Sequence, residues 1–407
     1  MIRSFIVVIF SLFSIVASAQ YYDTLPKGVR LLSTRYVQSN IESSYNKTQS
    51  ETPYVFEIDA SIENLQKIDN EVVQETLRLF EAYPEAYEKL SLGSHKLEGS
   101  AEVNVNVFAV GFGITSRVTA YIGMPIYDAS VNLKYSRSKV STNKEVAEIL
   151  QKEYGDNWAQ TLGNIVDGLF SVDENIIQSG IVNTLGYEEL GNWSGAGLGD
   201  IEFGVMYNFL RTDDFGIMAT IGGVAPTGYV DDPDILQDIG FGDGQWDAFL
   251  ELGGGYQLSK NIYLNTWSRY TYQLESTKEL RTPYNEDIFL SNKKDDYLEK
   301  LGNKFSVGIN SEILLNDWFK LQPAYIVNRT GKAKYESSNS TANKILAKNS
   351  ESSSQNIRLL AQISSVKLFS QDKFLLPAQI NFSYQTMIEG KNTPKVDLLE
   401  IDFRLYF

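Results

Sequence analysis

Apolar and polar residues alternate along many segments of ten or more residues in the chain. In residues 197–210, an apolar series alternates with a mostly polar or small series: Ile201, Phe203, Val205, Tyr207 and Phe209 against Asp200, Glu202, Gly204, Met206 and Asn208. Successive side chains of a β-strand point to opposite faces, so this pattern predicts a strand with one aromatic, apolar face. The same alternation recurs in 244–258, 302–315, 373–388 and 394–407.

Segment length and connection length favour a membrane barrel over a soluble β-sandwich, which also shows alternation. Strands of globular proteins usually have five or six residues, and these segments are longer. Short connections alternate with connections that are mostly long and polar. The short ones are 115–117, 211–214, 259–261, 316–317 and 370–373, and the others are about 140–196, 229–243, 276–301, 336–353 and 389–395. Short turns at one end and long loops at the other are typical of outer-membrane barrels.

The strand count follows from the same pattern. Eleven strands are expected between residues 99 and 407, and 28–38 supplies a twelfth, which gives the even number that such barrels require. The predicted fold is all-β: a transmembrane antiparallel β-barrel of about 12 strands, with helical inserts in long outer loops. Fourteen strands is the alternative if 53–61 also enters the wall.

The first nineteen residues predict a secretory signal peptide. Arg3 precedes an apolar stretch from Phe5 to Val16, and Ala17-Ser18-Ala19 places small residues before a cleavage site. The apolar stretch is too short to span a bilayer core of about 30 Å as a helix. We therefore expect a signal peptide at 1–19 and an outer-membrane barrel at 20–407.

Two inserts, 62–90 and 144–170, show helical spacing of apolar residues between charges. Their apolar side chains must cover one another, cap the barrel mouth or meet a ligand. The hypothesis is that they form a ligand-collecting surface, made of Leu65, Ile68, Val72, Leu79, Trp158, Leu162, Ile165 and Leu169. Residues 338–354 are rich in Ser and Asn and predict a mobile loop.

Composition removes several other classes of protein. The net charge of −15 without basic clusters argues against nucleic acid as a partner. With no Cys and one His, disulfides, thiol catalysis and Cys or multi-His metal sites are excluded. The 24 Tyr, 21 Phe and 30 Gly suit one large closed β-structure.

Candidate chemistry is sparse. His95 is the only imidazole, and nearby serines in sequence do not define a catalytic triad, so we expect neither an enzyme nor a cofactor. Asp231, Asp232, Asp234 and Asp238 cluster in one loop but lack EF-hand spacing, and no metal site is predicted. Polar inner-face positions are predicted to line the lumen, either as a water-filled path or as a paired, closed interior: Glu202, Asp247, Glu251, Arg269, Glu312, Arg358, Glu400, Asp402 and Arg404.

The stretch from Gly195 to Glu202, Gly-Ala-Gly-Leu-Gly-Asp-Ile-Glu, resembles a signature of the phenol meta-pathway outer-membrane proteins and of the broader fatty-acid and aromatic-hydrocarbon channel class. Further matches are Leu25 to Gly28, Gly113 to Arg117 and Pro226 to Gly228. The resemblance implies passive uptake of small hydrophobic or amphipathic solutes. The fatty-acid channels carry a sizeable N-terminal plug, which is not expected here because few residues precede Gly28.

The expected function is therefore an outer-membrane channel for such solutes, and the alternative is a structural or surface-interaction barrel with a closed lumen. The expected partners are outer-membrane lipid, a small hydrophobic solute and the barrel-assembly machinery. The last follows from Phe403, Leu405 and Phe407, which resemble the closing strand that this machinery recognises.

Overall fold

The structure is a computed structural model that describes residues 22–66, 71–156, 158, 163, 178–285 and 289–407. The predicted signal peptide, 1–19, lies outside the described residues. The chain divides into two compact units, one made of 1–53, 100–131 and 192–407, the other of 54–99 and 132–191.

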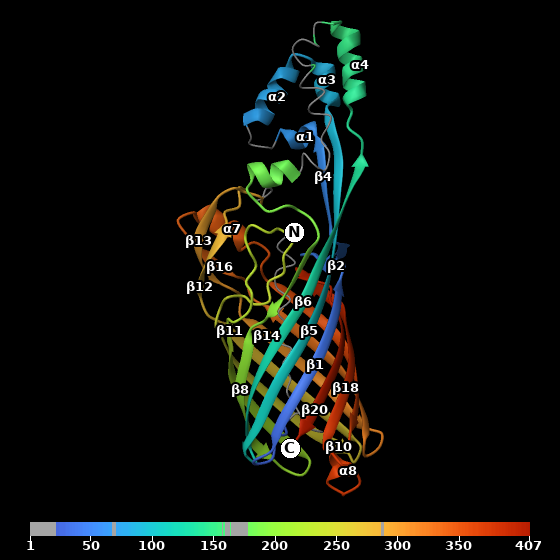
Figure 1. Ribbon diagram of the computed structural model, residues 1–407, viewed down its shortest axis with the longest axis vertical. Helices are drawn as coiled ribbons and strands as arrows, with labels where there is room; N and C mark the ends of the chain where they lie inside the picture. The colour runs from blue at the N-terminus through green and yellow to red at the C-terminus, as the bar shows by residue number, and fades with distance from the viewer. Residues whose placement is uncertain (1–21, 67–70, 157, 159–162, 164–177, 286–288) are drawn as a thin grey trace. The chain divides into compact units, whose positions relative to one another are not determined.

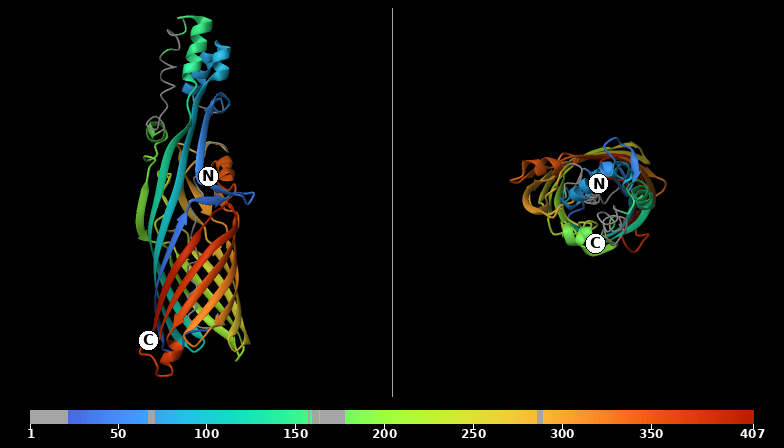
Figure 2. Two further views of the ribbon diagram at one scale, coloured as in Figure 1. Left: turned by 90° about the vertical axis from the view of Figure 1, so that its right-hand side faces the viewer. Right: turned by 90° about the horizontal axis from the view of Figure 1, so that it is seen from above.

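The first unit is a closed antiparallel barrel (Figures 1 and 2). Twelve strands form it within the described residues: β1 (Arg30–Ile41), β5 (Ser91–Thr115), β6 (Val118–Lys139), β8 (Ile201–Arg211), β9 (Phe215–Ala225), β10 (Asp247–Ser259), β11 (Ile262–Gln273), β14 (Lys304–Leu314), β15 (Phe319–Thr330), β17 (Ser352–Ser364), β18 (Ala378–Lys391) and β20 (Asp397–Tyr406). β1 pairs with both β5 and β20, which closes the ring. The predicted twelve strands are confirmed. Residues 53–61 do not add strands to the ring, because β4 (Val55–Ser61) pairs only with β5.

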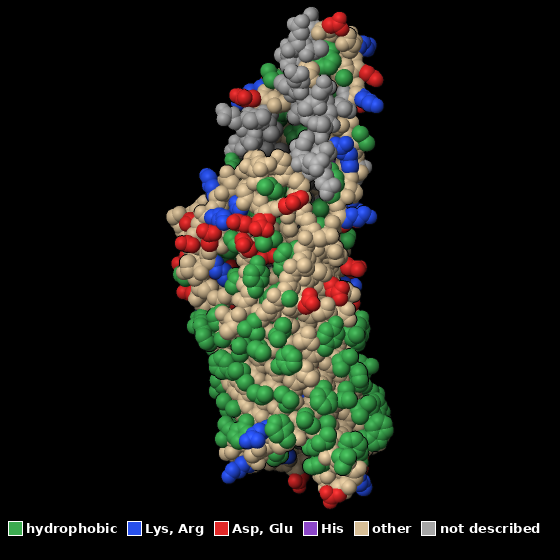
Figure 3. Space-filling view, viewed as in Figure 1, with side chains coloured by type: hydrophobic (Ala, Val, Ile, Leu, Met, Phe, Trp, Pro, Cys, Tyr) green, Lys and Arg blue, Asp and Glu red, His purple; other side chains and the backbone are tan. Residues whose placement is uncertain are grey.

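Each barrel strand separates an outer apolar face from an inner polar one. In β8, Phe203, Val205 and Tyr207 are exposed on the outside, whereas Glu202 and Asn208 are buried inside. Figure 3 shows the result on one face of the barrel, a broad band of hydrophobic side chains with charged groups gathered toward and beyond its edges. Such a band matches the apolar surface that a hydrocarbon layer requires.

The longer connections carry additional elements. β12 (Ser276–Arg281), β13 (Lys294–Lys300) and β16 (Lys334–Glu336) form a small sheet. A second one consists of β2 (Ser43–Tyr45), β3 (Glu51–Pro53) and β19 (Thr393–Pro394), and β7 (Trp193–Leu198) pairs with β6. One connection that was predicted to be short, between β17 and β18, also contains a short helix, α8 (Val366–Phe369).

The loop predicted at 338–354 instead contains a helix, α7 (Ser340–Leu346). Asn339 caps it, since its side-chain oxygen accepts hydrogen bonds from the backbone N–H groups of Thr341 and Ala342. Ala342 and Leu346 then pack against Tyr297 of β13. The prediction was wrong because Ser and Asn act here as helix-starting residues rather than as flexible ones.

The second unit has its own apolar core. The helices bounded within its described residues are α1 (Ile62–Leu65), α2 (Glu71–Glu81), α3 (Pro84–Lys89), α4 (Asn143–Tyr154) and a π-helical turn at Gly180–Thr184. Pro84 starts α3 at a position where a missing backbone N–H costs nothing. The buried residues are Leu65, Leu77, Phe80, Ala86, Leu90, Leu92, Val146 and Leu150. Among the described residues, no helix is long and apolar enough to cross a membrane.

We predict that Phe80→Ala unfolds the helical unit without opening the barrel. Phe80 is fully buried in that core, and such a truncation typically costs about 3–5 kcal/mol. Its neighbour Leu79 is 42% exposed, so Leu79→Ala is the matched control. Limited proteolysis should cut 62–90 faster in the first variant only, while the heat-dependent gel shift of the barrel persists. Equal cleavage of both variants would contradict a packed core.

Candidate functional site

The lumen is lined by the second face of the strands, and the nine predicted lumen residues lie there. Eight of them are buried: Glu202, Asp247, Glu251, Arg269, Glu312, Glu400, Asp402 and Arg404. Arg358 is partly exposed. A charge removed from water must be paired, so their partners decide what the lumen can do.

One group of these side chains connects strands that are not neighbours in the barrel, through the barrel interior. Arg269 of β11 donates to Glu202 of β8 at 2.7 and 3.3 Å, although β9 and β10 lie between the two strands. The hydroxyl of Tyr121 donates to the same carboxylate at 2.8 Å. The Arg269 guanidinium also lies 3.6 Å from the ring centre of Phe249, an arrangement that favours the cation. Glu251 is the direct register neighbour of Arg269.

A second group lies on β1, β17 and β20, near the point where the barrel closes. Arg404 donates to Asp402 at 2.7 Å, and Arg35 of β1 lies 3.8 Å from the same carboxylate. Glu400 pairs with Arg35 at 3.5 Å and with Arg358 at 3.1 Å. Elsewhere on the wall, Glu312 pairs with Lys320 at 3.1 Å. Most of the predicted lumen charges are therefore engaged with one another.

Aromatic rings form the other part of the lumen, and the alternation of residues along the sequence does not single them out. Tyr121 is the register neighbour of Gly204, and Phe249 is the register neighbour of Gly222. A Cβ on Gly204 would lie 3.0 Å from the Tyr121 ring, and one on Gly222 would collide with Phe249. Each glycine thus leaves room for an inward ring to lie against the wall. An inner-face aromatic opposite a glycine is a pattern that only the strand register reveals.

The chain before β1 also enters the lumen, at the end with the short turns. Tyr22 is fully buried, its ring covers Gly216 and Gly255, and its carbonyl accepts a hydrogen bond from the Asn208 side chain. The backbone N–H of Leu25 donates to Thr119 at 2.8 Å, and Asp23 pairs with Arg211 at 3.3 Å. A sizeable N-terminal plug was not expected, and among the described residues before β1 a short segment, 22–26, lies at this end of the barrel.

The segment between β9 and β10 folds back onto the end of β8, and the signature residues hold it there. Asp200 accepts hydrogen bonds from the backbone N–H groups of Gly228 at 2.9 Å and Asp243 at 3.2 Å. Thr227 donates to the carbonyl of Gly199 at 2.8 Å. The Gly195–Glu202 and Pro226–Gly228 motifs therefore fasten one loop to the barrel rim.

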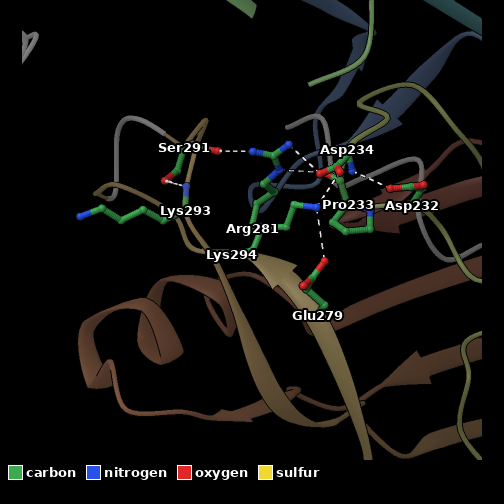
Figure 4. Close-up of polar contacts among 8 residues, drawn as sticks. All are labelled: Asp232, Pro233, Asp234, Glu279, Arg281, Ser291, Lys293 and Lys294. Atoms are coloured by element: carbon green, nitrogen blue, oxygen red, sulfur yellow. Dashed lines mark hydrogen bonds and ion pairs between the residues drawn. The ribbon is translucent and has the colours of Figure 1, made fainter. Parts of the chain in front are cut away.

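The aspartates of this loop are engaged with protein donors (Figure 4). Asp234 pairs with Arg281 at 2.6 Å and with Lys294 at 2.5 Å, and Asp232 accepts from the backbone N–H of Asp234. Asp238 accepts from the Tyr229 hydroxyl at 2.9 Å and from the backbone N–H of Asp232 at 2.7 Å.

Burial raises the pKa of Asp238 from its ordinary 3.8 to about 6. The folded loop therefore binds this proton more tightly than the unfolded chain does. Its contribution to stability consequently falls as the pH rises from about 4 to about 6.

The remaining candidates lie in the helical unit. His95 is buried, and its Nδ1 lies 2.6 Å from the Tyr135 hydroxyl. Of the predicted collecting residues, Leu65 is in the core, Trp158 packs against that core and Leu79 is exposed. The Val72 side chain and residues Ile68, Leu162, Ile165 and Leu169 lie outside what the structure describes.

Comparison with solved structures gives the fold class. An outer membrane channel from Pseudomonas putida F1 matches 95% of this chain and 98% of its own, with a TM-score of 0.53 and 13% identity. The Ralstonia pickettii toluene transporter TbuX matches 94% and 90% with a TM-score of 0.36 and 10% identity. A Pseudomonas aeruginosa FadL homologue matches 93% and 89% with a TM-score of 0.32 and 6% identity. The chain thus has the fold of an outer-membrane channel barrel. No family model matches the sequence, and no curated protein matches it.

We predict that Arg269→Met lowers the free energy of unfolding by about 3–5 kcal/mol, because it leaves the buried Glu202 carboxylate without its cation. The double variant Arg269→Met with Glu202→Gln should recover part of this loss. The control is Lys367→Met, which breaks an exposed pair with Asp317 and should cost under about 1 kcal/mol. Urea unfolding in lipid vesicles measures all three. Equal losses of unfolding free energy for Arg269→Met and Lys367→Met would show that the buried Arg269–Glu202 pair stabilises the protein no more than an exposed pair does.

Proposed function

We propose that the protein is an outer-membrane channel for passive uptake of small hydrophobic or amphipathic solutes. The observation that carries the proposal is the lumen, in which aromatic rings lie against wall glycines beside charges that are engaged with one another. The rings make part of the lining apolar, and charges that are paired with one another attract an ion weakly. The outer apolar band and the channel-barrel fold support an outer-membrane location.

The same charge pairing favours a second candidate, a closed structural barrel. Residues 22–26 fill one end of the lumen and so strengthen that alternative. The two functions differ in one measurable property, the transfer of an apolar solute across a membrane whose outer leaflet resists it.

The decisive experiment compares cells that produce the protein with cells that carry an empty vector, in a strain with an intact lipopolysaccharide layer. We expect faster accumulation of radiolabelled toluene in the producing cells, with no gain for labelled sucrose, because the lumen presents rings rather than a wide polar path. Equal toluene accumulation at normal outer-membrane yield would favour the closed barrel. Increased sucrose uptake would indicate a general diffusion pore.

We further propose that apolar residues of the helical inserts collect the solute. Trp158 is only partly buried and Leu79 is exposed, so both offer apolar surface. Trp158→Ser together with Leu162→Ser should slow toluene accumulation without lowering barrel yield. The control is Val140→Ser, an exposed apolar side chain of the same unit outside the inserts. Normal uptake in the double variant would leave these inserts as packed loops.

The barrel-assembly machinery stays a predicted partner.

A further inference from the structure

The buried ring of Phe241 lies in a pocket made of other aromatic side chains. It stacks on Tyr127 with ring centres 5.1 Å apart and planes 6° from parallel. Trp193 and Tyr229 lie at 6.3 and 5.8 Å, with their rings tilted by 51° and 57°. Three aromatic rings around a fourth give contact area on both a face and an edge, which is what a planar ring needs.

Most of this pocket belongs to barrel strand β6 and to β7, which pairs with it, rather than to the loop that carries Phe241. Tyr127 is an inner-face residue of β6, and Trp193 belongs to β7. Gly197 of β7 is the register neighbour of Tyr127, and a Cβ there would lie 3.5 Å from the Phe241 ring. The wall therefore keeps a flat aromatic surface and an open glycine position even without Phe241.

The loop presents Phe241 as a single inserted side chain. Gly240 and Gly242 flank it, and its backbone N–H donates to the Tyr229 carbonyl at 2.7 Å. Asp200 holds the loop at Gly228 and Asp243, on either side of the insertion. Glycines next to the ring allow this short segment to change conformation while both anchors stay in place.

We propose that the aromatic pocket formed by Tyr127, Trp193, Tyr229 and Gly197 is a binding site for an uncharged, planar, single-ring aromatic solute, and that Phe241 is its built-in occupant. This inference rests on the proposed uptake function and adds a specific site to it. A solute ring that enters the mouth takes the place of the Phe241 ring against Tyr127. The next luminal ring on the same strand is Tyr121, which lies over Gly204.

The test uses the full-length protein refolded in detergent, with 4-fluorophenol as the probe and ¹⁹F NMR as the readout. Phe241→Ala should bind the probe at least tenfold more tightly than the unaltered protein, because it leaves a space of ring size among Tyr127, Trp193 and Tyr229. Phe241→Leu should show little gain, since it keeps the pocket filled. Phe209→Ala makes the same truncation on the outer face of the barrel. It is the control for non-specific partition of the probe into the detergent around the protein.

Two further measurements separate this site from a generic cavity. Adding Tyr127→Ala to Phe241→Ala should abolish the gain, and phenol but not cyclohexanol should displace the probe, because stacking requires a planar ring. In the unaltered protein, the probe should speed hydrogen exchange at Phe241 and Gly242, whose N–H groups are released from the Tyr229 carbonyl.

Binding by Phe241→Ala no tighter than by Phe209→Ala, with the heat-dependent gel shift intact, would overturn the site. So would equal displacement by cyclohexanol, or unchanged exchange at Phe241 in the presence of the probe. If Phe241→Ala gains no affinity for the probe while producing cells still accumulate toluene, this inference alone is rejected. If the pocket binds the probe as expected while producing cells accumulate no toluene, the proposed function is rejected instead.

Discussion

The structure depends on one constraint, the closure of the twelve strands into a ring. A membrane interior offers no water to unpaired N–H and C=O groups, so each edge strand must find a partner. β1 meets this requirement by pairing with β20 on one side and β5 on the other. Closure with so few strands also fixes a narrow interior, and every inward side chain must fit within it.

Two kinds of side chain satisfy that interior, and they do so differently. Charged groups fill it by pairing across strands, as Arg269 does when it passes over β9 and β10 to reach Glu202. Aromatic groups fit by lying on glycines, as Phe249 does on Gly222. The first kind neutralises charge inside the barrel. The second kind is covered as well, since the Phe249 ring lies on Gly222 and under the Arg269 guanidinium.

The sequence predicted what local periodicity controls. Alternation in 201–209 identified β8 and its outward face, and the alternating connections gave the strand number. It could not predict which inner residues meet, because Glu202 and Arg269 are 67 residues apart and only the ring brings them together. It also missed α7, since Ser and Asn favour both loops and helix caps. The luminal segment 22–26 was missed because its hydrogen bonds go to Thr119 and Asn208, far along the chain.

The signature motif illustrates the difference between a conspicuous sequence and a functional group. The Asp200 carboxylate accepts hydrogen bonds from two backbone N–H groups, and its neighbour Gly199 lies against the Tyr127 ring. Together they determine where the loop that carries Phe241 returns to the barrel. A motif of small residues and one carboxylate thus acts through position, because it sets where Phe241 of the loop stacks on Tyr127 of β6.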